Sequence, residues 1–166
     1  MLTFSNLVLA IGTLITGLVA GLLFGFSVAV NPGLGRLTDA GYLQSMQSIN
    51  VAILNPVFLL CFMAPLILLP VATWMQYKHG ANGAWIWMLA ATLLYVIAVF
   101  GVTMGGNVPL NDALAKADLS IANPASLAAQ RAAFEPLWNK LHSIRTIANI
   151  ASLALCIYSC IITLKK

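Results

Sequence analysis

The sequence predicts an all-α integral membrane protein, a four-helix bundle in a single domain over residues 1–166. Hydrophobic residues make up 61% of the chain and charged residues only 7%, whereas a soluble domain carries about a quarter charged residues. Mean hydropathy is +0.94. Four long apolar stretches occur, at roughly 5–30, 51–76, 84–105 and 141–164. Each can cross the hydrocarbon core, which takes about 20 helical residues, and the short alternating strands of a β-barrel are absent from the sequence.

The first stretch is expected to be a retained spanning helix. A cleaved signal peptide would have an apolar region of about 7–15 residues behind a positive leader, but here no Lys or Arg precedes a longer apolar run. Gly17, Gly21 and Gly25 recur at every fourth position. Such a ridge lets another helix approach closely, either within this bundle or in a homo-oligomer.

The connectors that follow the first and third stretches are predicted to form a small helical cap over one end of the bundle. Residues 33–50 carry apolar side chains at near-helical spacing. Residues 110–122 and 125–140 are expected to form two further short helices, interrupted at Asn123-Pro124. Within the second stretch, three prolines are expected to kink the helix or to free backbone carbonyls.

Amide side chains collect at the same end of the predicted bundle as this cap. Asn107 and Asn111 flank the turn that ends the third helix, and Gln47 and Asn50 precede the second. Each residue alone fits ordinary interfacial polarity or helix capping. Together they predict a polar pocket that opens toward one membrane face.

The fourth stretch carries a polar stripe near its entrance. His142, Arg145 and Asn149 are three and four residues apart, so one helical face presents them, and Trp138 extends that face if the helix starts earlier. An arginine at the edge of hydrocarbon is costly unless it pairs, snorkels or lines a polar cavity. The stripe is therefore expected to form one wall of the pocket.

Several kinds of site are not indicated by the sequence. The histidines His79 and His142 are expected on opposite membrane sides, and no His, Cys or carboxylate spacing suggests a metal or a haem. No glycine-rich phosphate loop follows a strand, so no cofactor is predicted. The net charge of +4 is spread thinly, without a basic run for nucleic acid. The three cysteines fall in apolar stretches and are expected to pack there.

Four spans place both termini on the same side of the membrane. The opposite side holds more Lys and Arg but also all the acidic residues and most of the loop length, whereas basic density near the helix ends favours cytoplasmic termini. We predict cytoplasmic N and C termini in a bacterial inner membrane.

Three segments together resemble the anthrone oxygenase-like family of small four-helix membrane proteins. They are Met46-Gln47-x-Ile49-Asn50, Asn107-x-Pro109-Leu110-Asn111, and Trp138 followed by Arg145-Thr146. The resemblance covers nearly the whole chain in the same order, although His142 stands where the family pattern has an amide. It implies oxygenation of a polyketide anthrone to an anthraquinone without metal or flavin.

The residues suggest a compatible mechanism. His142 is a candidate base for the acidic C–H of an anthrone, and Arg145 with Asn107, Asn111 or Asn149 is expected to stabilise the enolate oxygen. Gln47, Asn50, Trp138 and Asn149 are predicted to bind the substrate. Two alternatives stay open: a membrane binding or transport module for a small apolar molecule, and a structural subunit of a membrane complex.

Overall fold

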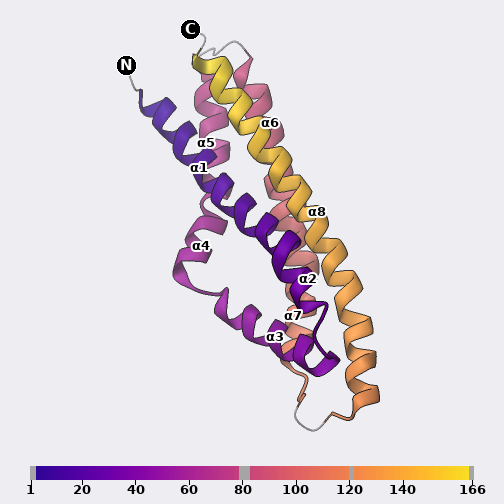
Figure 1. Ribbon diagram of the computed structural model, residues 1–166. Helices are drawn as coiled ribbons and strands as arrows, with labels where there is room; N and C mark the ends of the chain where they lie inside the picture. The colour runs from indigo at the N-terminus through magenta and orange to yellow at the C-terminus, as the bar shows by residue number, and fades with distance from the viewer. Residues whose placement is uncertain (1–2, 79–82, 120–121, 165–166) are drawn as a thin grey trace.

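The computed structural model describes residues 3–78, 83–119 and 122–164, and within these ranges every regular element is a helix. Four runs are long and apolar enough to cross a membrane: Phe4–Leu34, Pro56–Lys78, Ala84–Ala115 and Pro124–Thr163. The predicted all-α membrane bundle is therefore confirmed. The first run begins with α1, and α8 packs beside it in the opposite direction. The start of α1 and the end of α8 therefore lie at the same end of the molecule (Figure 1).

The described ranges contain eleven helical elements, of which α3 lies between the first two runs. They are α1 (Phe4–Gly25), η1 (Phe26–Val30), α2 (Asn31–Leu34), α3 (Asp39–Ala52), α4 (Pro56–Met63), α5 (Pro65–Lys78), α6 (Ala84–Leu93), η2 (Leu94–Gly101), η3 (Thr103–Asn107), α7 (Val108–Ala115) and α8 (Pro124–Leu164). The elements η1, η2 and η3 are π-helical.

Three predicted helix boundaries were wrong. The expected helix over 110–122 is α7, which ends at Ala115 and continues the third run. The second span begins at Pro56 rather than at 51, because the Asn55 side chain accepts a hydrogen bond from the Phe58 amide and caps α4. The expected separate helix over 125–140 is the first part of α8, which runs 41 residues without a break. Pro136 removes one backbone donor from α8 without ending it.

The first part of α8 persists because its apolar face is buried against the cap. Phe134 and Trp138 belong to a core cluster with Tyr42, Leu43 and Met46 of α3. A 41-residue helix is about 60 Å long, roughly twice the hydrocarbon thickness of about 30 Å. The helix α8 is therefore longer than the hydrocarbon core is thick, and its first part packs with α3 and α7 at one end of the molecule (Figure 1). The cap predicted from the connectors is thus present, with α3, α7 and the start of α8 as its parts.

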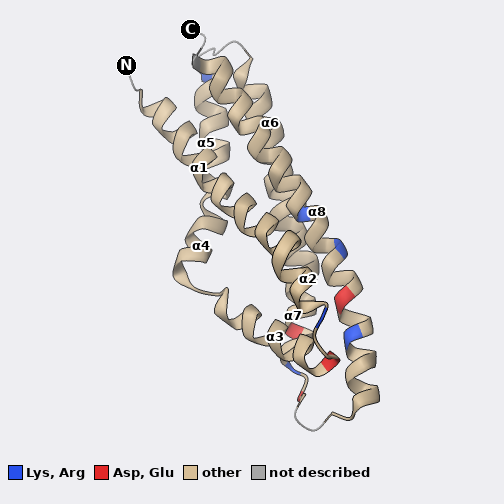
Figure 2. Cartoon of the chain, viewed as in Figure 1, with Lys and Arg blue, Asp and Glu red and all other residues tan. Residues whose placement is uncertain are grey.

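Charged side chains follow the same division. In Figure 2 most lie on the cap and on the adjoining part of α8. Arg131 joins these elements, since it contacts Asp39 at 3.1 Å and Glu135 at 2.6 Å. Its guanidinium also donates to the backbone carbonyls of Gly35 and Leu37. Arg131 therefore holds the connector before α3 against α8.

The π-helical elements η1 and η3 each end two residues before a proline. The amide of Asn31 donates to the carbonyl of Phe26, and the amide of Val108 donates to that of Thr103, both five residues back. A proline ring in an α-helix collides with the carbonyl four residues before it. The wider turn therefore accommodates Pro32 and Pro109 while the helices continue, and such π-helical turns are frequent at functional sites.

Among the described glycines, Gly106 allows a helix approach that an added Cβ would obstruct. A Cβ on Gly17 would meet Leu153 of α8 at an ordinary distance of 3.5 Å, whereas one on Gly106 would lie 2.8 Å from Leu141 Cδ1. Gly21 and Gly25 have nothing within 4 Å of an added Cβ. Part of the glycine ridge thus packs inside the bundle, and homo-oligomerisation through the rest stays a prediction.

Candidate functional site

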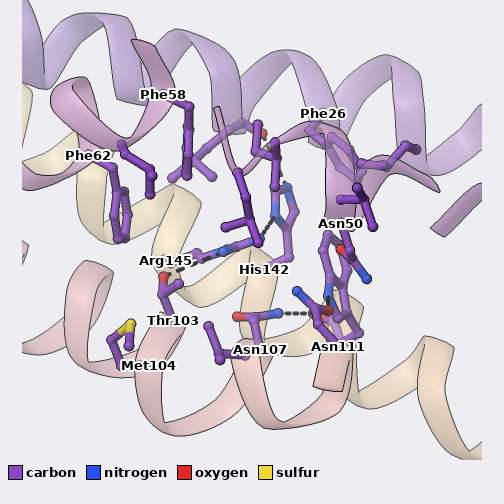
Figure 3. Close-up of a pocket in the computed structure, with 18 of the residues that line it drawn as sticks. Phe26, Asn50, Phe58, Phe62, Thr103, Met104, Asn107, Asn111, His142 and Arg145 are labelled. Atoms are coloured by element: carbon purple, nitrogen blue, oxygen red, sulfur yellow. Dashed lines mark hydrogen bonds between the residues drawn. The ribbon is translucent and has the colours of Figure 1, made fainter. Parts of the chain in front are cut away.

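A cavity of about 290 Å³ lies where the cap meets the membrane-spanning part of the bundle. Figure 3 shows side chains from α1–η1, α3, α4, η3 and α8 converging on it. Its polar lining comes from Gln47, Asn50, Thr103, Asn107, Asn111, Asp112, His142 and Arg145. Its apolar lining includes Leu22, Leu23, Phe26, Ile49, Val51, Ile53, Leu54, Phe58, Leu59, Phe62, Met63, Met104, Val108, Ala115 and Trp138.

Several apolar lining residues also face away from the protein. Val51 is 75% exposed and Leu54 67% exposed, and Met63 and Met104 are exposed as well. A patch of exposed apolar side chains beside a spanning helix is typical of a membrane-facing surface. The cavity therefore has a rim of side chains shared between its interior and the bilayer, formed by α3, α4 and η3.

Arg145 is the positively charged group of the site. Its Nη2 donates to His142 Nδ1 at 3.0 Å, and its Nη1 donates to Thr103 Oγ1 at 3.4 Å. Its guanidinium carbon lies 5.3 Å from the centre of the Trp138 ring, a cation–π distance. In the described part of the chain the ion pairs are those of Arg131, and none compensates Arg145.

His142 is buried, with a 1% exposed fraction, and both ring nitrogens are engaged. A guanidinium only donates, so Nδ1 accepts from Arg145 and the proton of the neutral ring belongs to Nε2. Nε2 lies 2.8 Å from Ser27 Oγ and 3.2 Å from the Leu23 carbonyl. The ring therefore spans the gap between η1 and Arg145.

Trp138 supports this arrangement by stacking and hydrogen bonding. Its ring is stacked on His142, with centroids 5.1 Å apart and planes 9° apart. Its Nε1 donates to Asn111 Oδ1 at 2.8 Å, and its carbonyl accepts from Asn107 Nδ2 at 3.3 Å. The two asparagines thus fix Trp138, and Trp138 fixes the plane of the imidazole.

Three residues that line the cavity each carry a buried polar atom without a hydrogen-bond partner: Arg145 Nε, Asn107 Oδ1 and Asn50 Nδ2. An unpaired buried polar atom costs about 1–3 kcal/mol, more when charged. Two donors and one acceptor around one cavity therefore suit a ligand that carries oxygen atoms.

Of the eight residues that the sequence singled out, seven line this one cavity: Gln47, Asn50, Asn107, Asn111, Trp138, His142 and Arg145. Their catalytic and binding roles stay predictions. Gln47 also donates to the carbonyls of Leu114 and Ala117 and so fastens the end of α7 to α3. Asn149 is fully buried on the same α8 stripe but does not line the cavity.

Sequence reasoning missed Ser27, Thr103 and the aromatic residues Phe26, Phe58 and Phe62. Ser27 was detectable as a rare polar residue in an apolar stretch, close to Asn31. The aromatic residues gave no signal, because phenylalanine in a spanning helix faces lipid as readily as a cavity.

Metal-binding groups were also sought. Among residues 3–78, 83–119 and 122–164, no group of three or more His, Cys, Asp or Glu side chains is placed to hold a metal ion. His79, which entered the sequence argument on metals, lies outside the described residues. Cys61, Cys156 and Cys160 are free thiols.

Comparison with known proteins bears on the family. Neither the curated proteins nor the solved structures gave a match to this chain. A model of the family described as anthrone oxygenase matches residues 55–155, well over half of the 166 residues. That segment contains the whole of η3 and α7 and the part of α8 that carries Trp138, His142 and Arg145. The chain is therefore an integral membrane protein that belongs to the anthrone oxygenase family.

Proposed function

We propose that the chain oxygenates a flat, apolar aromatic ketone of the anthrone type to the corresponding quinone, with dioxygen as the oxidant. The observation that carries the proposal is the Arg145 guanidinium, which lines the cavity, has no carboxylate partner among the described residues and carries a buried Nε without a hydrogen bond. A cation with a free donor in a largely apolar cavity suits an oxygen atom that becomes negative during reaction. The enolate oxygen of a deprotonated anthrone is such an atom.

The reaction balances with dioxygen alone. Removal of a proton from the methylene carbon opposite the carbonyl gives an enolate, which passes an electron to dioxygen and then forms a carbon–oxygen bond to it. The resulting peroxide takes up the proton, and loss of water leaves a second carbonyl. One oxygen atom enters the quinone and the other leaves as water.

In the proposal, His142 removes the methylene proton and Arg145 stabilises the enolate oxygen. In the resting site Arg145 Nη2 occupies the Nδ1 lone pair of His142. When the carbonyl oxygen of a substrate accepts the hydrogen bond of the guanidinium in place of His142, Nδ1 loses that donor and can accept the methylene proton. Substrate binding would thus expose the base only when the enolate-stabilising group is already in place.

The lipid-facing rim supports the same class of substrate. Val51 and Leu54 at the cavity are largely exposed, so a molecule dissolved in the bilayer can enter without passing through water. The aromatic rings of Phe26, Phe58 and Phe62 line the cavity and suit a flat aromatic ligand. Dioxygen, which is apolar, shares the route.

The test is oxygen uptake by the purified protein with anthrone and with dithranol, corrected for the spontaneous oxidation of both. We expect turnover to a quinone with one labelled oxygen atom from ¹⁸O₂. Arg145→Ala should lower turnover by about 10²–10³-fold, the effect of removing one oxyanion donor. Lys140→Ala is the matched control, because Lys140 is an exposed basic residue of α8 that does not line the cavity.

The outcomes separate the functions that remained open. No uptake above the spontaneous rate with either ketone would contradict the oxygenase. Saturable binding of anthrone without product, lost in Arg145→Ala, would instead favour a binding or transport module. Unchanged turnover in Arg145→Ala would contradict the role given to the guanidinium.

A further inference from the structure

We propose that Ser27 is a positioning residue that sets which edge of the His142 imidazole faces Arg145. The proposal rests on the function above in so far as His142 acts as the base. Ser27 lies in η1, on the opposite side of the imidazole from Arg145, and it entered neither the sequence motifs nor the mechanism. Its Oγ is the nearest polar atom to His142 Nε2, at 2.8 Å.

Stacking alone leaves the imidazole with two orientations. Trp138 holds the ring plane at 9° to its own, and Phe26 covers the ring at a centroid distance of 5.3 Å. A half-turn about the Cβ–Cγ bond preserves both contacts but exchanges a nitrogen for a carbon at each edge. The polar groups around the ring must therefore decide between the two orientations.

Hydrogen bonds at Nε2 make that choice. Ser27 Oγ donates to the Leu23 carbonyl at 3.0 Å, which leaves its lone pairs to accept the Nε2 proton. The Leu23 carbonyl itself lies 3.2 Å from Nε2, and Thr146 Oγ1 lies 3.4 Å away with its own proton donated to the His142 carbonyl. Ser27 thus provides the shortest acceptor for the Nε2 proton.

The consequence reaches the cavity through the ring. With Nε2–H held at η1, the lone pair of Nδ1 must point toward Arg145, where Nη2 donates to it at 3.0 Å. In the turned orientation a C–H would face the guanidinium, and the cavity would lose its candidate base. Ser27 would therefore act through His142, at a distance from the substrate.

The experiment uses the full chain in lipid with ¹³C,¹⁵N-labelled histidine. The sequence has two histidines, so a His79→Gln background leaves His142 as the sole histidine signal. Before any substitution at Ser27, we expect one sharp set of signals with Nε2 protonated and Nδ1 unprotonated. In Ser27→Ala we expect a second set or broadening, and in Ser27→Thr, which keeps the hydroxyl, a return to one set.

Thr16→Val is the matched control. Thr16 is buried in the same helix, and its hydroxyl also donates to the carbonyl four residues back, that of Gly12, but it makes no contact with His142. We expect Thr16→Val to leave the His142 signals unchanged. Where turnover is measured, Ser27→Ala should lower kcat about 10-fold or more with little change in KM, and Ser27→Thr should recover most of it.

Two results would overturn the proposal. One is a proton on Nδ1 before any substitution at Ser27, and the other is an unaltered single set of signals in Ser27→Ala. Neither depends on turnover, so a protein without oxygenase activity would contradict the proposed function while the spectra still decide the role of Ser27.

Discussion

At the residue scale, the resting hydrogen bonds of His142 set a condition on its chemistry. Nδ1 accepts from Arg145 and Nε2 faces Ser27, so neither nitrogen is free while the guanidinium stays in place. A permanently unoccupied base beside an arginine would also attract water, which competes for reactive intermediates. In the proposed function, the pairing would keep the site inactive until a ligand with a suitable oxygen enters.

A pair of substitutions tests His142 as the base. His142→Phe keeps the stacking on Trp138 and removes both nitrogens, while His142→Asn restores the amide of the family pattern. If the imidazole removes the proton, both variants should lose turnover by about 10²–10⁴-fold. Initial rates of quinone formation decide the matter, and full activity in His142→Asn would assign the proton transfer elsewhere.

At the element scale, η3 must lie close to α8 for Thr103 to reach Arg145. Gly106 permits this approach because the Leu141 side chain occupies the space that a Cβ would need. Its neighbour Gly105 faces open space, so the packing of η3 against α8 requires a glycine at position 106 but not at position 105.

Substitution of each glycine should therefore give opposite results. Gly105→Ala should leave the protein as stable or slightly more so, since alanine favours helix by about 0.5–1 kcal/mol. Gly106→Ala should be less stable than Gly105→Ala by about 1 kcal/mol, the low end of the range for overpacking, because the obstructing atoms belong to the movable end of the Leu141 side chain. Thermal unfolding in detergent measures the difference.

The contact partner supplies the control for this prediction. Leu141→Ala in the Gly106→Ala background removes the clash and should recover part of the lost stability relative to the sum of the single changes. Equal melting temperatures for the two alanine variants would mean that Leu141 turns away without cost and that Gly106 does not set the helix spacing.

At the scale of the whole molecule, the four spans fix which loops share a membrane side. The helix α5 ends at Lys78 near the end of the molecule where α1 begins and α8 ends, whereas Arg36 lies in the connector between α2 and α3 at the other end (Figure 1). The predicted cytoplasmic termini would place the cavity and cap toward the outer face of a bacterial inner membrane. That orientation stays a prediction from charge density near the helix ends.

Cysteine labelling tests the topology directly. In intact cells, a membrane-impermeant maleimide should modify Arg36→Cys but not Lys78→Cys, and in inverted vesicles the pattern should reverse. The three native cysteines lie within or between the spanning helices and should give a low background in the unsubstituted chain. Labelling of both positions from one side would contradict four spans, and an exchanged pattern would contradict the predicted orientation.

The sequence predicted the parts that follow from composition and spacing. Four apolar runs gave the spans, and the amides around Asn107 and Asn50 pointed to the correct end, where the cavity lies. It failed on the length of α8, because apolar residues such as Phe134 were assigned to a separate cap helix. Asn149 shares the helical face of Arg145 but lies outside the cavity lining, since periodicity gives direction and not depth.

The contact between Ser27 and His142 joins residues 115 positions apart, and no local pattern encodes such a pair. It depends on the crossing of α1 with α8 and on the widened turn of η1 ahead of Pro32. Both are tertiary features. A proline after a polar residue in a spanning helix indicates an altered turn, but the partner of that residue comes only from the packed bundle.

The exposed side chains that rim the cavity have a consequence for how affinity must be expressed. A substrate that enters from among the acyl chains meets the protein at its mole fraction in the bilayer, not at its concentration in the buffer. At fixed substrate, added lipid or detergent dilutes the substrate in two dimensions and should raise the apparent KM in proportion, with kcat unchanged. Under the proposed entry from lipid, the affinity of this protein for its substrate is therefore defined by the mole fraction of substrate in the bilayer.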